Sequence, residues 1–398
     1  MSFDLIARLL LPPGGGGEIA EADAQWASPQ AAHEARTMVW GREPTWEPAG
    51  LALARFAGRR ERALLSLRRP TDGLRLVRVH RWGSRFHRAR RVPELMWRLR
   101  EGAVVELARG PQPPRVADAV ARTAGVASPI GRFHIAAGGG MTVRTEGAGR
   151  RVVLRIGVTG SGSDPSASAK GLERLAPLAH PCVPELLGRG TANGASWTLE
   201  SELAGRVPSR LTPAVVAAAA AFCARLPAQE AAPTAFGEHI AQLVDLLPDR
   251  AAALRALEAR VAPHVAELPS VLAHGDLWTG NLLMQGPRLR GVIDWETWHL
   301  AAVPGTDLMH LIGADLAARS QRTFAELMPD RPWRSPLFRG TPPHYWEAVG
   351  VEPTEPVLKA IAIAWWAGQT AIRLGHRPAD AADAVWRHRN VDAALTAT

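Results

Sequence analysis

The chain has 398 residues, of which 46% are hydrophobic, so it is long enough for two domains or one large two-lobed unit. The sequence contains no uncharged apolar stretch as long as a membrane-spanning helix and no basic segment typical of a secretory signal, so we expect no membrane partner. Only Cys182 and Cys223 are present, which excludes a disulfide framework and favours a cytoplasmic protein with reduced thiols.

The net charge of +9 is distributed unevenly along the chain. Residues 1–128 contain 21 basic and 13 acidic residues, whereas the remaining 270 residues are nearly balanced, with 26 and 25. The excess is densest in an arginine-rich run at 81–91. We interpret this run as a solvated loop, because no known nucleic-acid-binding motif accompanies it. A nucleic-acid partner is therefore not expected.

Residues 1–125 are predicted to form a small α+β domain. Short β-like runs lie at 63–67, 74–79 and 104–107, and a helical stretch lies at 93–99. The segment Pro12 to Gly17 lacks the spaced glycines and the preceding strand of a dinucleotide-binding loop, so it favours a flexible turn. A proline-rich segment at 111–114, followed by a helical piece at 116–124, indicates a domain boundary.

A run of strands followed by helices is predicted after this boundary. The strands lie at 132–135, 141–145, 151–156, 184–190 and 196–201, with an Asn193-Gly194 hairpin turn between the last two. The helices lie at 212–226, 237–247 and 250–268, and two more lie at 354–374 and 379–395. We expect Trp365, Trp366 and Trp386 in the last two helices to be core residues.

The most informative segment lies between the third helix and the C-terminal helices. A strand at 270–273 leads into the loop His274-Gly275-Asp276-Leu277-Trp278-Thr279-Gly280-Asn281, and two further strands at 282–284 and 291–293 precede Asp294. Asp276 and Asn281, five positions apart, can place a proton acceptor beside a divalent cation, and Asp294 completes a set of oxygen ligands suited to Mg²⁺. Phosphoryl transfer needs these groups: one residue that orients the attacking hydroxyl and others that hold the metal.

This arrangement resembles the aminoglycoside phosphotransferase family, whose pattern is His-Gly-Asp, four residues, Asn, and then Ile-Asp-Trp. The segment Pro304-Gly305-Thr306-Asp307-Leu308 is similar to the family's downstream Asp-Leu segment, which opens a helix. The resemblance covers about residues 129–398. It implies a bilobal protein-kinase-like α+β fold, with a small antiparallel β lobe at 126–203 and a mainly helical large lobe at 204–398, preceded by the separate domain at 1–125.

The resemblance also implies an activity and its residues. It implies a kinase that uses ATP and Mg²⁺ to phosphorylate a hydroxyl group of a small molecule. Asp276 would be the catalytic residue that accepts or orients the hydroxyl proton, and Asn281 and Asp294 would bind the metal. His274 is expected to brace the loop through hydrogen bonds, and Asp307 to serve as the N-cap of a helix.

The nucleotide site implied by the resemblance lies in the small lobe. Gly138, Gly139 and Gly140 would form a loop whose backbone approaches the phosphates, and the backbone around Glu202 and Leu203 would bind the adenine edge.

Arg155 stands where kinases ordinarily have the phosphate-holding lysine, and its planar guanidinium is not equivalent to an ammonium group. Glu173 is its expected partner, and Lys170 is the alternative phosphate ligand.

Arg155 leaves a second interpretation open. The chain could be a catalytically weak kinase-like module that binds a nucleotide or metabolite to regulate the N-terminal domain. The presence of Asp276, Asn281 and Asp294 favours the enzyme, with a nucleotide and a small hydroxylated substrate as partners. The near-neutral charge of residues 129–398 argues against a polycationic aminoglycoside as the acceptor, since such a substrate favours an acidic cleft.

Overall fold

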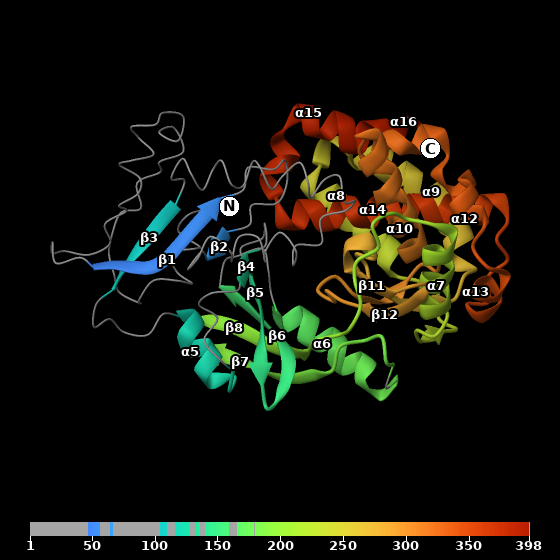
Figure 1. Ribbon diagram of the computed structural model, residues 1–398. Helices are drawn as coiled ribbons and strands as arrows, with labels where there is room; N and C mark the ends of the chain where they lie inside the picture. The colour runs from blue at the N-terminus through green and yellow to red at the C-terminus, as the bar shows by residue number, and fades with distance from the viewer. Residues whose placement is uncertain are drawn as a thin grey trace. The chain divides into compact units, whose positions relative to one another are not determined.

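The computed structural model describes residues 47–55, 64–66, 104–109, 116–126, 133–135, 140–158, 165–178 and 180–397. The chain forms two compact units, residues 1–203 and 204–398. Figure 1 labels most of the described helices and strands. Among the helices that the structure describes, none combines the length and the apolar character that crossing a membrane requires.

Three strands are described before residue 110. Strand β1 (Glu47–Arg55) pairs in antiparallel fashion with β2 (Leu64–Ser66) and with β3 (Val104–Arg109), in the order β2-β1-β3. Strands β2 and β3 were predicted from the sequence, whereas β1 was missed because it contains Pro48 and Gly50. The predicted elements at 74–79 and 93–99, the glycine-rich turn at 12–17 and the basic run at 81–91 lie outside the described residues.

A second sheet, with five antiparallel strands, is described in the N-terminal unit after residue 132. Its strands are β4 (Phe133–Ile135), β5 (Met141–Gly147), β6 (Arg150–Val158), β7 (Leu186–Ala192) and β8 (Ala195–Ser201), in the order β4-β5-β6-β8-β7. All five strands were predicted, with bounds shifted by a few residues. The hairpin turn at Asn193-Gly194 is also confirmed, since both residues have positive φ angles, 49° and 73°, as a type I′ turn requires.

Two helices accompany this sheet, α5 (Val116–Thr123) and α6 (Pro165–Leu175). Helix α6 packs on strands β6, β7 and β8 and buries Ala169, Leu172 and Leu175, which recur at helical spacing. On the sheet, Leu154 and Ile156 alternate with more exposed neighbours and are fully buried. Leu154 and Ile156 therefore lie on one apolar face of the sheet, opposite to the face that α6 contacts.

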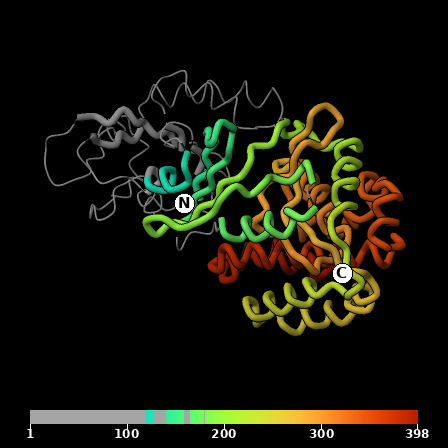
Figure 2. The backbone as a smooth tube through the Cα atoms, turned by 90° about the horizontal axis from the view of Figure 1, so that it is seen from below, coloured from blue at the N-terminus to red at the C-terminus, as the bar shows by residue number. Residues whose placement is uncertain are grey.

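The C-terminal unit begins with helices α7 (Pro213–Cys223), α8 (Ala235–Leu246) and α9 (Ala251–Ala266). A small sheet follows, in which β10 (Ser270–Ala273) pairs with β9 (Ala228–Gln229) on one side and β13 (His299–Ala302) on the other. The hairpin of β11 (Leu282–Gln285) and β12 (Arg288–Val292) is a separate pair. Figure 2 shows the helices of this unit as successive coils along the backbone.

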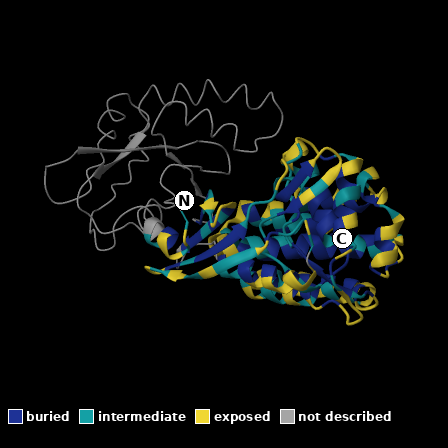
Figure 3. Cartoon of the chain, turned by 60° about the horizontal axis from the view of Figure 1, so that its bottom comes forward, coloured by how far each residue is buried: buried dark blue, intermediate teal, exposed yellow. Residues whose placement is uncertain are grey.

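Two long helices pack together in the interior of this unit, α10 (Thr306–Ser320) and α14 (Glu355–His376). Trp365 and Trp366 of α14 are 2% and 0% exposed, as expected for core residues. Short helices connect and follow the long ones: α11 (Phe324–Leu327), α12 (Pro336–Arg339), α13 (Pro343–Ala348), α15 (Ala384–Arg387) and α16 (Ala393–Ala397). In Figure 3 the buried residues of the unit gather in its interior.

The prediction of one helix at 379–395 is wrong. The segment is divided into a 3₁₀ helix (Pro378–Ala382), α15, a π-helix (His388–Asp392) and α16. Asp383 causes the first break, because its backbone is extended and its carboxylate accepts hydrogen bonds from the N–H groups of Val385 and Trp386. This is an N-cap, which starts a new helix instead of continuing the previous one.

Candidate active site

The loop His274–Asn281 joins β10 to β11, and its backbone is shaped by a glycine. Strand β10 is buried along its whole length and brings the chain to the loop. Gly275 has a φ angle of 81°, and a Cβ atom added there would lie 2.0 Å from the carbonyl oxygen of Thr297. Only glycine satisfies both conditions, since it has no Cβ and readily adopts positive φ. The loop therefore passes unusually close to the segment that follows Asp294.

His274 is fully buried and braces the loop, as predicted. Its Nδ1 atom accepts a hydrogen bond from the N–H of Asp276 at 3.2 Å. The ring proton therefore lies on Nε2, which donates to the carbonyl of Ile293 at 3.0 Å. The ring also packs against Trp295, with 4.6 Å between the ring centroids. His274 thus ties the loop to the end of β12 and presents no group to a substrate.

Asp307 has a structural role, but the prediction that it is a helix N-cap is wrong. The N-cap of α10 is Gly305, and Asp307 is the second residue of the helix. The Asp307 carboxylate instead accepts hydrogen bonds from the backbone N–H groups of His274 at 2.7 Å and of Gly275 at 2.9 Å. This pair of bonds fastens the start of the loop to the first turn of α10.

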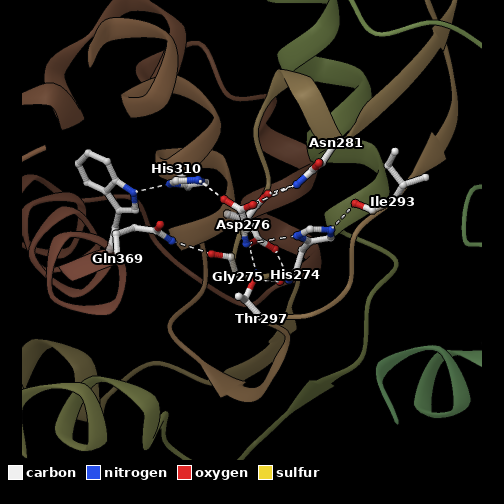
Figure 4. Close-up of polar contacts among 10 residues, drawn as sticks. His274, Gly275, Asp276, Asn281, Ile293, Thr297, His310 and Gln369 are labelled. Atoms are coloured by element: carbon white, nitrogen blue, oxygen red, sulfur yellow. Dashed lines mark hydrogen bonds and ion pairs between the residues drawn. The ribbon is translucent and has the colours of Figure 1, made fainter. Parts of the chain in front are cut away.

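Asp276 presents its carboxylate at the centre of the site (Figure 4). Its Oδ2 accepts a hydrogen bond from Nδ2 of Asn281 at 3.2 Å, and its Oδ1 lies 3.0 Å from Nε2 of His310. Burial alone would raise the pKa of Asp276, but the hydrogen bond with His310, together with His274 and Asn281, brings the pKa below its ordinary value. The side chain is 40% exposed, so an ionised carboxylate remains open to a ligand.

Asn281 directly precedes β11, and Asp294 lies two residues after the end of β12, so the two residues flank the β11–β12 hairpin. The Nδ2 of Asn281 also donates to the carbonyl of Asp276 at 2.9 Å, so the amide nitrogen faces two acceptors and Oδ1 is the atom that can bind a cation. The N–H of Ile293 donates to the carbonyl of Asn281 at 3.0 Å, which places Asp294 one residue beyond this link. Asp294 has a φ angle of 75°, a strained conformation that is rare outside glycine and is common at functional sites.

The oxygen atoms of Asn281 and Asp294 suit Mg²⁺ better than a metal ion whose ligands all come from protein side chains. No cluster of three or more His, Cys, Asp or Glu side chains suited to a metal is found in the described part of the chain. One amide oxygen and one carboxylate are a typical protein share for Mg²⁺, which takes its remaining ligands from water and phosphate. Asn281 and Asp294 could therefore hold a magnesium ion together with a phosphate-containing ligand.

Arg155 forms an ion pair in the N-terminal unit, but not with the predicted partner. Its Nε lies 3.0 Å from Oε1 of Glu200, and these side chains are 12% and 3% exposed. Ser168 of α6 also donates to Oε1 of Glu200, at 3.2 Å. The expected partner, Glu173, pairs instead with Arg189 at 3.1 Å, so the Arg155–Glu173 prediction is wrong.

The register of the sheet explains this difference. Arg155 on β6 lies opposite Thr198 on β8, and Glu200 is two residues further along β8, so Arg155 and Glu200 share one face of the sheet. Lys170, the alternative phosphate ligand, is exposed on α6.

The other predicted nucleotide contacts are described only in part. Gly138 and Gly139 lie outside the described residues, and Gly140 is buried immediately before β5. At the end of β8, the N–H of Glu202 donates to the carbonyl of Arg151 at 3.2 Å, and its carboxylate pairs with Arg144 and Arg151 at 3.5 and 3.3 Å. Leu203 is the last residue of the N-terminal unit.

Sequence reasoning missed three residues around Asp276. His310 contacts its carboxylate, Trp365 donates from Nε1 to Nδ1 of His310 at 3.0 Å, and Gln369 donates to the carbonyl of Gly275 at 2.6 Å. His310 lies one helical turn after Asp307, on a helix that the sequence did predict. The three-residue spacing between Asp307 and His310 could have indicated His310, because residues three apart lie on the same side of a helix.

A five-stranded antiparallel sheet, followed by a mainly helical unit that carries a His-Gly-Asp loop, defines a protein-kinase-like α+β fold. Residues 141–334 match the family described as "Phosphotransferase enzyme family". This segment contains β5 to β8 and the whole His274–Asn281 loop, so the resemblance expected from the sequence is confirmed over these residues. No curated protein matches the chain.

Several solved small-molecule kinases are similar to the chain at low identity. An aminoglycoside-3′-phosphotransferase of type VIII is 20% identical, covering 63% of this chain and 97% of its own, with a TM-score of 0.40. An ethanolamine kinase from Plasmodium vivax is 13% identical, covering 66% and 81%, with a TM-score of 0.43. The choline kinase LicA from Streptococcus pneumoniae is 15% identical, covering 70% and 96%, with a TM-score of 0.41.

Proposed function

We propose that the protein is an ATP- and Mg²⁺-dependent phosphotransferase that phosphorylates a hydroxyl group of a small molecule. The observation that carries the proposal is the Asp276–Asn281 contact. It sets a partly exposed, ionised carboxylate next to an amide whose oxygen is left for a cation. A proton acceptor beside a metal ligand is what phosphoryl transfer requires of the protein, since the rest of the catalysis is positioning and electrostatics.

In this proposal Asp276 accepts or orients the proton of the acceptor hydroxyl. Asn281 and Asp294 would hold Mg²⁺, which supplies charge neutralisation at the transferred phosphoryl group. The hydrogen bonds that His274 makes, and those that the Asp307 carboxylate accepts, hold the loop in one conformation, so that the Asp276 carboxylate is already in place when the acceptor arrives.

The nucleotide contacts of the proposal come from the N-terminal unit. Arg155 and the loop at Gly138–Gly140 would hold the phosphates, and the backbone near Glu202 and Leu203 would bind adenine. Arg155 keeps its charge at any physiological pH, and its ion pair with Glu200 orients the guanidinium without relying on Glu173. Solved kinases similar to this chain have been crystallised with ADP, which supports the choice of nucleotide.

The alternative is a catalytically weak module that binds a nucleotide for regulation. The Arg155–Glu200 pair favours it, because a guanidinium committed to a buried carboxylate has less charge to offer a phosphate. A module of this kind would bind nucleotide but would not consume it in response to any acceptor.

A screen of ATP consumption with Mg²⁺ tests the proposal. The acceptor panel contains amino alcohols, sugars, nucleosides and antibiotics, and the variants are Asp276→Asn and, as a matched control, Asp245→Asn at an exposed position of α8. We expect acceptor-dependent turnover that falls by about 100-fold or more in Asp276→Asn and is unchanged in Asp245→Asn. Nucleotide binding without turnover on any acceptor would support the regulatory module instead, and full turnover by Asp276→Asn would remove the role given to that residue.

A further inference from the structure

His310 lies between an indole and the Asp276 carboxylate, and the chemistry of its two neighbours determines where its proton is. The N–H of Trp365 lies 3.0 Å from Nδ1 of His310, and an indole N–H can only donate. Nδ1 must therefore be the accepting nitrogen, and the ring proton must lie on Nε2. That atom is 3.0 Å from Oδ1 of Asp276, so a neutral His310 donates a hydrogen bond to the carboxylate (Figure 4).

Packing holds this chain of three residues in place. The side chain of His310 is 5% exposed and Trp365 is 2% exposed. The ring of Phe324 meets His310 edge-on, with 5.5 Å between centroids, and lies 4.8 Å from Trp365. Gly313 of α10 makes the arrangement possible, because a Cβ atom there would lie 2.4 Å from the Trp365 ring. The indole therefore occupies space that only a glycine on α10 leaves open.

We infer that His310 is a positioning residue that holds the Asp276 carboxylate in its working orientation, and that Trp365 keeps His310 in the neutral form that donates from Nε2. The inference rests on the proposed function, since it assigns His310 a task in the reaction of Asp276. Each carboxylate oxygen then has one donor, His310 on Oδ1 and Asn281 on Oδ2. Two donors from different elements define the plane of the carboxylate, which one donor would leave free to rotate.

The same geometry excludes His310 as a proton relay. Its Nε2 already carries the proton that it donates, and its Nδ1 lone pair accepts from Trp365. A proton that Asp276 receives from the acceptor must therefore leave through the exposed side of the carboxylate. Helix α14 also holds the loop backbone directly, through Gln369, one turn beyond Trp365. Through Trp365 and Gln369, helix α14 therefore sets the geometry of the His274–Asn281 loop.

The experiment compares His310→Gln, His310→Leu and Trp365→Phe in the full-length protein. Glutamine offers one N–H donor and one carbonyl acceptor, as neutral histidine does, but it can never carry a positive charge, whereas leucine offers neither group. We expect His310→Leu to lower kcat by about 10- to 100-fold, with KM changed by less than about 3-fold, and His310→Gln to remain within about 5-fold of the wild type. Thermal unfolding of each variant shows whether it is folded.

Two further measurements test the role of His310 without an activity assay. In ¹⁵N-histidine NMR spectra, the His310 signals are identified by their loss in His310→Gln. We expect a proton on Nε2 alone in the wild type and a mixture of tautomers in Trp365→Phe. Crystal structures should show the Asp276 side chain in its wild-type rotamer in His310→Gln and in a different rotamer in His310→Leu.

Three outcomes would overturn the inference. They are a proton on Nδ1 of His310 in the wild type, a His310→Gln variant as slow as His310→Leu while folded, and an unchanged Asp276 rotamer with wild-type kcat in His310→Leu. If the proposed function is wrong, the results differ from these three outcomes. No acceptor-dependent turnover would be found even in the wild type, while the NMR spectra and the Asp276 rotamer would still decide the role of His310.

Discussion

Gly275 is the residue whose replacement tests the close approach of the loop to Thr297. Alanine at this position must adopt a φ angle of 81°, at a cost of about 1–2 kcal/mol, and must also accommodate a Cβ atom 2.0 Å from the Thr297 carbonyl oxygen. We expect Gly275→Ala to abolish turnover and to lower the melting temperature by several degrees, because the backbone on both sides of the contact must move. Calorimetry and the acceptor assay measure the two effects.

Gly286 provides the matched control, because its φ angle of 59° is also positive but a Cβ atom there would have no neighbour within 4 Å. Gly286→Ala carries the conformational cost alone, about 1 kcal/mol, and should leave turnover close to that of the wild type. Equal losses in the two variants would show that the close approach to Thr297 is not what makes Gly275 necessary.

At the residue scale, the sequence predicted the groups on the loop but not their partners. Asp276 and Asn281 were identifiable because the five-residue spacing of a loop constrains them locally. His310 is 34 residues from Asp276, and its position depends on how α10 packs against the loop. The partner of Arg155 was missed for a similar reason, since it follows from the register between β6 and β8 and not from the spacing along α6.

At the scale of elements, the packing of α14 on α10 depends on Gly313. Alanine ordinarily stabilises a helix relative to glycine by about 1 kcal/mol, yet at position 313 its Cβ would lie 2.4 Å from the buried Trp365 ring. We expect Gly313→Ala to destabilise the protein by about 1–3 kcal/mol and to lower kcat, because the displaced indole releases His310. Chemical denaturation and the acceptor assay provide the measurements.

Gly237 of α8 is the control for this substitution. A Cβ atom there would meet Oε1 of Glu258 at 3.5 Å, an ordinary contact. Gly237→Ala should therefore be neutral or stabilise the protein by up to about 1 kcal/mol. If Gly313→Ala changes the free energy of unfolding no more than Gly237→Ala does, the contact between α14 and Gly313 does not limit the residue at position 313.

A second prediction at this scale concerns the ion pair that joins α11 to the π-helix. Hydrogen bonds from Arg389 to both carboxylate oxygens of Glu326, at 2.7 and 3.0 Å, lower the pKa of Glu326 from 4.5 to about 2. A lowered pKa means that the stabilisation is complete above the unfolded-state pKa, near 4.5, and disappears as the pH falls through about 2.

The variant Glu326→Gln isolates this charge, since glutamine can still accept the capping hydrogen bond from the N–H of Thr323. The pair is partly exposed to solvent, so we expect a melting temperature about 2 °C below that of the wild type at pH 6. This difference should shrink as the pH falls from 4.5 towards 2. A difference that does not change with pH would show that the charge of Glu326 contributes nothing.

At the scale of the whole molecule, the sequence was informative wherever one element could be identified from its own pattern. Strands β5 and β6 alternate buried and less buried residues over part of their length, and α8 and α9 repeat buried apolar residues every three or four positions, so these elements were predicted. The segment at 379–395 has helical composition throughout, and its first break is set by the cap at Asp383. A cap depends on which N–H groups a side chain reaches, and composition does not determine this.

Binding of ATP with Mg²⁺ stabilises the folded protein as a whole, and in the proposed function Asp294 is one of the residues that hold the metal. Ligand binding raises the free energy of unfolding by about 2.7 kcal/mol at 100 times the dissociation constant, so ATP with Mg²⁺ should raise the melting temperature. We expect Asp294→Asn to reduce this increase to the value seen with ATP and EDTA, because asparagine lacks the charge that Mg²⁺ prefers. Asp245→Asn should retain the full increase.

The role of Arg155 in nucleotide binding cannot be tested by a single substitution that removes its charge. Removing Arg155 leaves the buried Glu200 carboxylate unpaired and destabilises the ligand-free protein. The double variant Arg155→Met, Glu200→Gln removes both charges, so the change in melting temperature on adding ATP with Mg²⁺ then reports binding alone. We expect this change to be largely lost in the double variant and partly kept in Arg155→Lys, which retains a cation for the phosphates. A full increase in the double variant would show that Arg155 has only a structural role and that another cation holds the phosphates.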